Sequence, residues 1–334
     1  MKAILYVSHP EAQLMAQVLD RPYIQHVVEQ LVRRGVDRID LFLRASDKSA
    51  ASLLGDGTRW GISIEGRLLT ESPSRWDFAA CCDCDEKGLA VFGDLGRLPA
   101  LPELGEADPL TLKPAIYFHD ENRISRWTGW GLLPERDIPE FAATAVKHDN
   151  WRVALLECGV CVDKVFTEQP SLCVTTPRYV IEANRAALES QFSGLYFDGS
   201  ERNSGVWIGR GAKVPTTAIL HAPCLIGEDA WIGEDCHVGP HAVIGRRCVV
   251  ERNTRVCRSV VAEGTYLGPG LDVTDSVVVR NKIHNVRLDV DLEIDEPHVA
   301  SNLMQGPLLP TWLRVTLFTI LIASVLLLVG RLGR

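Results

Sequence analysis

The chain has 334 residues, which is enough for about two domains. Hydrophobic residues make up 46% of it and charged residues 23%, so a globular protein with a sizeable core is expected. The formal net charge is −8 and no cluster of lysines and arginines occurs, which excludes a general nucleic-acid-binding protein, because phosphate binding requires clustered positive charge.

The region up to about residue 200 alternates apolar runs with helical patterns. Residues 2–8 are typical of a short buried strand. Residues 23–34 carry apolar side chains at helical spacing and end at Gly35, and residues 38–43 are again typical of a strand. This β–α–β order predicts a mainly parallel sheet covered by helices.

Four segments of this region match the motifs of one enzyme family. They are residues 21–39, 54–64 (LGDGTRWGISI), 91–95 (VFGDL) and 176–185 (TPRYVIEANR). They resemble the nucleotide-sugar pyrophosphorylases, the sugar-1-phosphate nucleotidyltransferases that include mannose-1-phosphate guanylyltransferase. The resemblance implies a Rossmann-like α/β nucleotidyltransferase domain over residues 1–200.

The resemblance also implies a ligand site. Asp94 matches a strand-end aspartate that holds the catalytic Mg²⁺, although a purely structural carboxylate is an equal alternative. Trp127 and Trp130 fall in the region where the family binds sugar, and packing beneath the sheet is the alternative for both. The candidates for nucleotide or sugar binding are therefore Asp94, Gly55, Asp56, Gly57, Arg59, Trp60, Trp127 and Trp130.

The opening of the chain departs from the family pattern. The family has a glycine-rich loop and a lysine that bind the nucleotide phosphates, whereas the first 34 residues here contain no glycine. Ala12 lies near the lysine position, and Glu11 adds a charge of the wrong sign. The family's second metal-binding aspartate falls on Cys173 or Val174. Because phosphoryl transfer depends on Mg²⁺ and cations, we expect little or no pyrophosphorylase activity; an active enzyme with a rebuilt loop is the first alternative.

A repeat of six residues begins at Ile208. Branched aliphatic residues occupy every sixth position, and the small residues two positions earlier include three buried cysteines, Cys224, Cys236 and Cys248. The phase slips by one after Val256. The pattern resembles the hexapeptide repeat and predicts a left-handed parallel β-helix over residues 201–285. The aliphatic series is Ile208, Val214, Leu220, Ile226, Ile232, Val238, Ile244, Val250 and Val256.

Three histidines of the repeat leave a second alternative open. Hexapeptide acyltransferases use a histidine as general base, and His221, His237 and His241 are available for that role. Solvated side chains on the face of a solenoid are the simpler interpretation, because no long loop protrudes to build an acyl-donor site.

Four further cysteines have the spacing of metal ligands. A CxC and a CxxC motif together supply the four thiolates of tetrahedral zinc. The two motifs lie far apart, and the second is also typical of a buried strand, so both interpretations stand. The zinc candidates are Cys81, Cys84, Cys158 and Cys161.

The end of the chain carries an uncharged apolar run. Residues 315–330 have no charge, and with its flanks the run predicts one transmembrane helix over residues 311–331. Residues 286–310, acidic and interrupted by prolines, are expected to be a linker. The N-terminus has no signal-peptide pattern, so we expect an anchor in the inner (cytoplasmic) membrane with the soluble domains in a reducing cytoplasm.

Together these features predict a membrane-anchored member of the pyrophosphorylase family that serves surface or exported polysaccharide synthesis. Its catalysis is expected to be degenerate, with a role in binding a nucleotide sugar or in scaffolding membrane proteins of the pathway. Related families imply a homo-oligomer formed through the β-helix. Mg²⁺ is expected only if catalysis survives.

Overall fold

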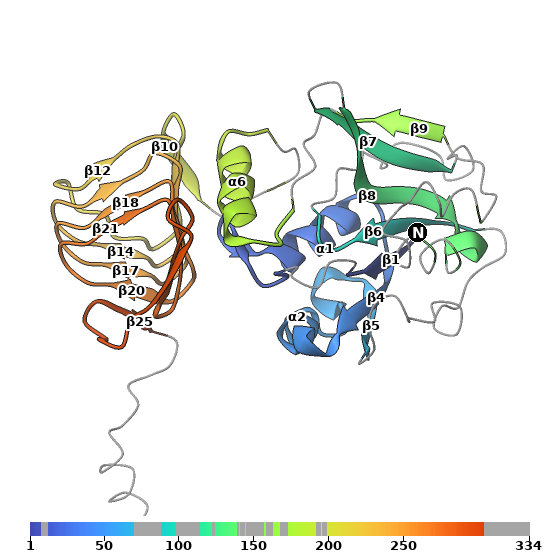
Figure 1. The fold of residues 1–334 in the computed structure, drawn as a ribbon, viewed down its shortest axis with the longest axis horizontal. Coiled ribbons are helices and arrows are strands. Elements are labelled where there is room, and N and C mark those ends of the chain that lie inside the picture. The colour runs from blue at the N-terminus through green and yellow to red at the C-terminus, as the bar shows by residue number, and fades with distance from the viewer. Residues whose placement is uncertain are drawn as a thin grey trace, which may run out of the picture.

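The computed structural model describes residues 1–7, 13–69, 88–97, 114–121, 124–138, 163–167, 173–191 and 199–303, with residues 140, 144, 157 and 195 between them. An α/β domain and a β-helix lie side by side (Figure 1). The predicted anchor at 311–331 and all four zinc candidates fall outside the described residues. No helix within the described ranges is long and apolar enough to cross a membrane.

A seven-stranded mixed sheet forms the centre of the α/β domain. Its order is β5-β4-β1-β6-β8-β7-β9, and the first four of these strands are parallel. Strands β4 and β6 lie on opposite sides of β1, so the strand order reverses between β1 and β6. The strands are β1 (Lys2–Tyr6), β4 (Arg38–Arg44), β5 (Ser63–Leu69), β6 (Leu89–Asp94), β7 (Ala115–Glu121), β8 (Ile124–Pro134) and β9 (Asp163–Phe166).

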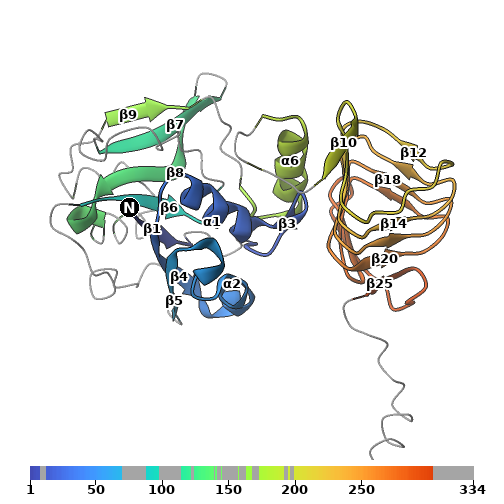
Figure 2. The ribbon, with the colours of Figure 1, turned by 180° about the vertical axis from the view of Figure 1, so that it is seen from behind.

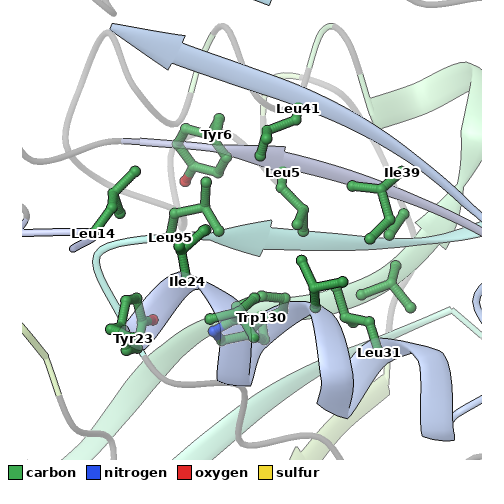
Figure 3. Packing of buried hydrophobic residues seen from close by; sticks show 14 of the residues in the cluster. Leu5, Tyr6, Leu14, Tyr23, Ile24, Leu31, Ile39, Leu41, Leu95 and Trp130 are labelled. Carbon is green, nitrogen blue, oxygen red and sulfur yellow. The ribbon is translucent and has the colours of Figure 1, made fainter. Parts of the chain in front are cut away.

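Helix α1 (Tyr23–Arg33) covers this sheet and supplies much of the core. Its residues Ile24 and Leu31 point toward Leu5 and Ile39 of the strands (Figure 3). The predicted β–α–β order is therefore present. The remaining elements of this domain are β2 (Gln17–Val18), β3 (Arg21–Pro22), η1 (Ala45–Asp47), α2 (Lys48–Leu54), η2 (Thr58–Trp60), η4 (Glu135–Asp137) and α6 (Pro177–Leu188).

The repeat region folds into a three-sided stack of short parallel strands. Cys224 pairs with Val206 and with Ala242, each 18 residues away, so that one coil contains three hexads. The spacing shortens to 17 where Val243 pairs with Val260, as the predicted phase slip requires. The parallel strands are β11 (Val206–Ile208), β12 (Ile219–Leu220), β13 (Cys224–Ile226), β14 (Trp231–Ile232), β15 (His237–Val238), β16 (Ala242–Ile244), β17 (Val249–Val250), β18 (Arg255–Cys257), β19 (Val260–Val261), β20 (Thr265–Leu267), β21 (Asp272–Thr274) and β22 (Ser276–Val279).

The interior of the β-helix is apolar, as the period predicts. The inward aliphatics from Ile226 to Val256 are at most 1% exposed, and the three repeat cysteines are fully buried. Burial raises the pKa of the Cys224 and Cys248 thiols to about 12, so both remain protonated core side chains.

Antiparallel strands close both ends of the stack, and they correct the predicted linker. Strand β10 (Ser200–Asn203) pairs with β11 at the first coil. At the other end β23 (Lys282–Asn285) and β24 (Val290–Glu293) extend one sheet, and β25 (Ala300–Asn302) pairs with β20. The prediction of a linker from residue 286 is therefore wrong up to residue 303, because these residues continue the sheets of the β-helix.

One face of the β-helix packs against the α/β domain. The outward residues Leu225, Val243 and Val260 are at most 1% exposed and belong to the core of the α/β domain rather than to the prism. Helix α6 lies between the sheet and the β-helix in both views and contacts β19 and β22 (Figures 1 and 2). The two domains are thus held together by a buried apolar contact.

Candidate functional site

The candidate site lies at the carboxyl edge of the central sheet, between β1 and β6. Asp94 is the last residue of β6, and it is paired in register with Tyr6 at the end of β1. Its side chain is 5% exposed, and its Oδ1 accepts a hydrogen bond from the Gly96 amide at 3.0 Å. In open α/β sheets, ligands bind at this edge where the strand order reverses.

The segment that matches the family's second aspartate lies opposite Asp94. Cys173 forms a β-bridge with Arg97, and the Val174 amide donates to the Gly96 carbonyl at 3.2 Å. Burial raises the pKa of the Cys173 thiol, which keeps it neutral. Instead of two carboxylates, this edge therefore combines one carboxylate with a neutral thiol and an arginine.

These donors do not fit a Mg²⁺ site. Mg²⁺ prefers oxygen ligands, and a protonated thiol is a poor replacement for a carboxylate. Within the described part of the chain, no group of three or more histidine, cysteine or acidic side chains is placed to hold a metal ion. The geometry assigns no metal-dependent step to Asp94.

The start of α1 is also closed to phosphate. The amide of Tyr23 donates to the Ala16 carbonyl at 2.8 Å, and the amide of Ile24 donates to the Leu14 carbonyl at 3.0 Å. Free amides at a helix N-terminus form a ready anion site, but the chain's own carbonyls occupy these two. Gln13, just before them, donates its amide to Val174 at 2.9 Å and ties this segment to the site.

Tyr23 is the residue of this site that the sequence interpretation missed. It is fully buried, and its hydroxyl has no hydrogen-bond partner among the described residues. Burial raises its pKa well above the ordinary value, and the nearby charge of Asp94 adds to the effect. Its hydroxyl is therefore a permanent donor beside Asp94. A tyrosine at the start of an amphipathic helix gave no sequence signal beyond core packing.

The two tryptophans pack within the domain. Trp130 is fully buried, and its Nε1 donates to the Arg97 carbonyl at 3.0 Å. Trp127 is partly buried, and its Nε1 donates to the Trp130 carbonyl at 3.2 Å. Stacking of Trp130 on a sugar is excluded because its ring has no exposed face, so the packing alternative is correct for that residue.

The glycine-rich segment at residues 55–60 lies at the opposite edge of the sheet. It precedes Ser63, which pairs with Arg38 at the amino end of β4. Asp94 pairs with Tyr6 and therefore lies at the carboxyl ends of the parallel strands. The Thr58 amide donates to Asp56 Oδ1 at 3.0 Å, which makes a local turn. Gly55, Gly57, Arg59 and Trp60 belong to the same turn, so none of these candidates converges with Asp94.

The residues of this turn are explained by local packing rather than by ligand binding. Gly57 has φ +85°, and a Cβ there would lie 2.8 Å from the Ile62 carbonyl oxygen, so only glycine fits. The Arg59 guanidinium lies 3.7 Å from the centre of a Trp60 ring. The motif therefore fixes the entry into β5.

The three histidines of the β-helix do not assemble a general-base site. His241 Nε2 lies 2.8 Å from Glu189 Oε1 at the contact with α6, so it is engaged between the domains. His221 and His237 stack on an outer face with ring centroids 6.2 Å apart. The acyltransferase alternative gains no support from this arrangement.

Comparisons with known proteins give one sequence match. Residues 220–291 match the family described as the GMPPB C-terminal domain. This range covers most of the β-helix and the hairpin after it. No curated protein matches the chain.

Two solved structures resemble part of the chain. One is 4-diphosphocytidyl-2C-methyl-D-erythritol synthase from Anaerococcus prevotii, with TM-score 0.43 and 16% identity, covering 56% of this chain and 97% of that one. The other is a putative glucose-1-phosphate thymidylyltransferase from Bacillus anthracis, with TM-score 0.42 and 13% identity, covering 56% and 95%. Similarity at this level does not establish a shared fold or activity.

Proposed function

We propose that this chain is a membrane-anchored relative of the sugar-1-phosphate nucleotidyltransferases that binds a nucleotide sugar without converting it. In this proposal it serves surface or exported polysaccharide synthesis and brings the nucleotide sugar, or membrane proteins of the pathway, together at the membrane. The match of residues 220–291 to the GMPPB C-terminal domain and the motifs around Asp94 support the family assignment.

The observation that carries the proposal is the pairing of Cys173 with Arg97 opposite Asp94. Phosphoryl transfer depends on Mg²⁺ that bridges phosphate oxygens and neutralises the charge that develops on them. A site with one carboxylate and a protonated thiol lacks the ligands for that ion. Loss of one preorganised group commonly costs about 10²–10³ in rate, so turnover is expected to be very slow.

The occupied amides at the start of α1 support the same conclusion. In an active site of this class, backbone amides would approach the phosphates. Here the carbonyls of Ala16 and Leu14 already accept hydrogen bonds from the amides of Tyr23 and Ile24.

The test is calorimetry on the full-length chain with nucleoside triphosphates and nucleotide sugars, with and without Mg²⁺. The expected result is binding of a nucleotide sugar with no pyrophosphate release from nucleoside triphosphate and sugar 1-phosphate. Asp94→Asn should alter the affinity, because it removes a negative charge from the site. Asp56→Asn, at the opposite edge of the sheet, is the matched control and should leave it unchanged.

Two other outcomes decide against the proposal. Mg²⁺-dependent turnover that is lost in Asp94→Asn would restore the active nucleotidyltransferase. If no nucleotide or nucleotide sugar binds, the proposed ligand site is wrong and only the scaffold role remains.

The membrane anchor needs a separate test. We expect the full-length chain to sediment with membranes and to require detergent for extraction, while a chain ending at residue 310 stays in the supernatant. Sedimentation of both forms would place the membrane contact elsewhere in the chain.

A further inference from the structure

Within the described part of the chain, the buried hydroxyl of Tyr23 is a donor without an acceptor. The side chain is 0% exposed, and no described residue accepts a hydrogen bond from it. Nearly all buried polar groups in native proteins have a partner, and an unpaired one destabilises the fold. The hydroxyl is enclosed at the strand-end site in this structure, so a ligand oxygen becomes its acceptor only where binding displaces the side chains that cover it.

Arg97 is held beside the same site. Its backbone bridges to Cys173, and its carbonyl accepts from Trp130 Nε1 at 3.0 Å. Gly129 has φ +87°, and a Cβ there would lie 2.8 Å from Arg97 Cδ and 3.3 Å from Asp94 Cβ. One glycine therefore makes room for a cation and a carboxylate side by side.

This arrangement balances charge without a metal ion. A site with two carboxylates needs the two positive charges of a divalent metal, whereas among the described residues Asp94 stands with Arg97 and the neutral thiol of Cys173. The guanidinium matches the geometry of phosphate oxygens, and it has several donors to share among partners. Asp94 and Arg97 both act electrostatically on the Tyr23 hydroxyl, so the hydroxyl lies within range of both charges.

We propose that the Tyr23 hydroxyl and the Arg97 guanidinium together bind a phosphate oxygen of the ligand, and that this binding needs no divalent metal. The inference rests on the proposed function, because it assigns the phosphate contacts of the same nucleotide-sugar site. The alternative is an ordered water on the Tyr23 hydroxyl, which would leave the ligand untouched.

The test compares Tyr23→Phe with the wild type in the full-length chain by calorimetry in EDTA. The probes are a nucleotide sugar, a nucleoside diphosphate, a sugar 1-phosphate and the free sugar. A lost hydrogen bond to a charged oxygen should weaken the phosphate-bearing probes about tenfold or more. The free sugar should show no difference between the two proteins. Tyr117→Phe, a buried tyrosine on β7, is the matched control and should bind like the wild type.

A second measurement separates this role from a structural one. Because the hydroxyl is unpaired, Tyr23→Phe should melt at the same temperature as the wild type or higher. Unchanged affinity in Tyr23→Phe overturns the inference, as does a lower melting temperature, which would reveal a structural partner. Failure of the wild type to bind any probe would instead contradict the proposed function on which the inference rests.

The arginine provides an independent check. Arg97→Ala should weaken phosphate-bearing probes in EDTA, and Arg97→Lys should recover part of the loss, because it keeps the charge but not the planar fork. If wild-type affinity requires Mg²⁺, the claim of metal-independent binding is wrong even where Tyr23 contributes.

Discussion

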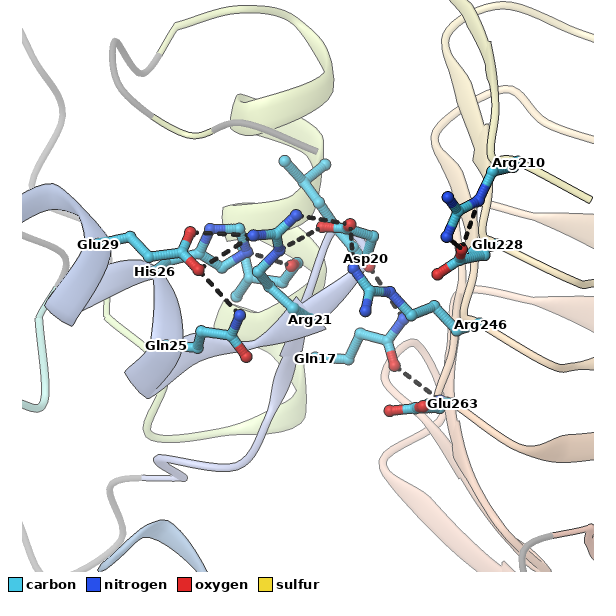
Figure 4. A network of polar contacts seen from close by, with 12 residues as sticks. Gln17, Asp20, Arg21, Gln25, His26, Glu29, Arg210, Glu228, Arg246 and Glu263 are labelled. Carbon is cyan, nitrogen blue, oxygen red and sulfur yellow. Dashed lines mark hydrogen bonds and ion pairs between the residues drawn. The ribbon is translucent and has the colours of Figure 1, made fainter. Parts of the chain in front are cut away.

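Arg246 of the β-helix donates to Asp20 of the α/β domain, with 2.9 Å between Nη2 and Oδ2, although the two residues lie 226 positions apart (Figure 4). Asp20 is 1% exposed and also accepts two hydrogen bonds from Arg21. Nearby, the Glu263 amide donates to Gln17 Oε1 at 2.7 Å. The hairpin of β2 and β3 therefore connects the β-helix to the segment that begins at Gln13.

Loss of this interdomain ion pair should be measurable. Arg246→Ala removes an arginine partner from the buried carboxylate of Asp20, which we expect to cost about 1–3 kcal/mol. The measurement is the urea midpoint of the full-length chain. Arg178→Ala is the control, because its pair with Glu182 is exposed and should contribute little. Equal midpoints for wild type and Arg246→Ala would show that the pair does not stabilise the contact.

The apolar contact between the domains gives a second prediction. Val243→Asp would bury an unpaired charge against the α/β core, so we expect the domains to separate or the chain to lose about 3 kcal/mol or more. Small-angle scattering and limited proteolysis would detect a larger radius and a newly cleaved connection. Ile219 occupies the same outward position of its hexad, but its side chain is 47% exposed. The control variant Ile219→Asp should therefore behave like the wild type.

A buried histidine predicts a loss of stability in acid. His26 Nε2 donates to the Val18 carbonyl at 2.7 Å, and burial lowers the pKa of this histidine from 6.5 to about 4. Between these values the unfolded chain binds a proton that the folded chain does not, so stability falls as pH falls below 6.5. At about pH 5 the loss should reach about 2 kcal/mol relative to about pH 7.5.

The pH prediction is checked by urea titrations at both pH values. His26→Gln keeps a donor for Val18 but cannot titrate, so it should lose this part of the pH dependence. His298→Gln, at an exposed position, should keep the wild-type dependence. An identical pH dependence in wild type and His26→Gln would contradict the assignment.

Close packing beside Asp94 gives a fourth prediction. A Cβ on Gly93 would overlap the ring of Trp130, so Gly93→Ala must displace a fully buried side chain, at a cost of about 1–3 kcal/mol. Because Gly93 precedes Asp94, ligand affinity should fall as well. Gly66→Ala lies in β5 with nothing within 4 Å of its added methyl group. Thermal unfolding should show a loss for the first variant and none for the second.

The β-helix could be predicted in detail because its period is set locally. Each inward position must be apolar, so the sequence alone located the coils and the phase slip between Val256 and Val261. It did not identify the partner of the outward residues such as Leu225 and Val243. Docking against α6 depends on residues far away in the chain, and a repeat pattern contains no information about them.

The candidate site was predicted only in part. Asp94 lies at a strand end, where the motif placed it, and Cys173 lies opposite it. The motif at residues 54–64 suggested ligand contacts, but the register of β5 places its turn at the other edge of the sheet. Tyr23 was missed because the sequence does not show which groups surround its hydroxyl in the folded chain, and so does not show that the hydroxyl has no hydrogen-bond partner among the described residues.

The bonds from α1 to Leu14 and Ala16 constrain any attempt to engineer catalysis into this chain. Insertion of a glycine-rich loop after β1 would supply new amides, but the two at the start of α1 would stay bonded to the chain's own carbonyls. A designer would first have to detach residues 13–22, which are tied on one side to Val174 and on the other to Glu263 and Arg246. Regaining the chemistry would therefore require loosening the joint between the two domains.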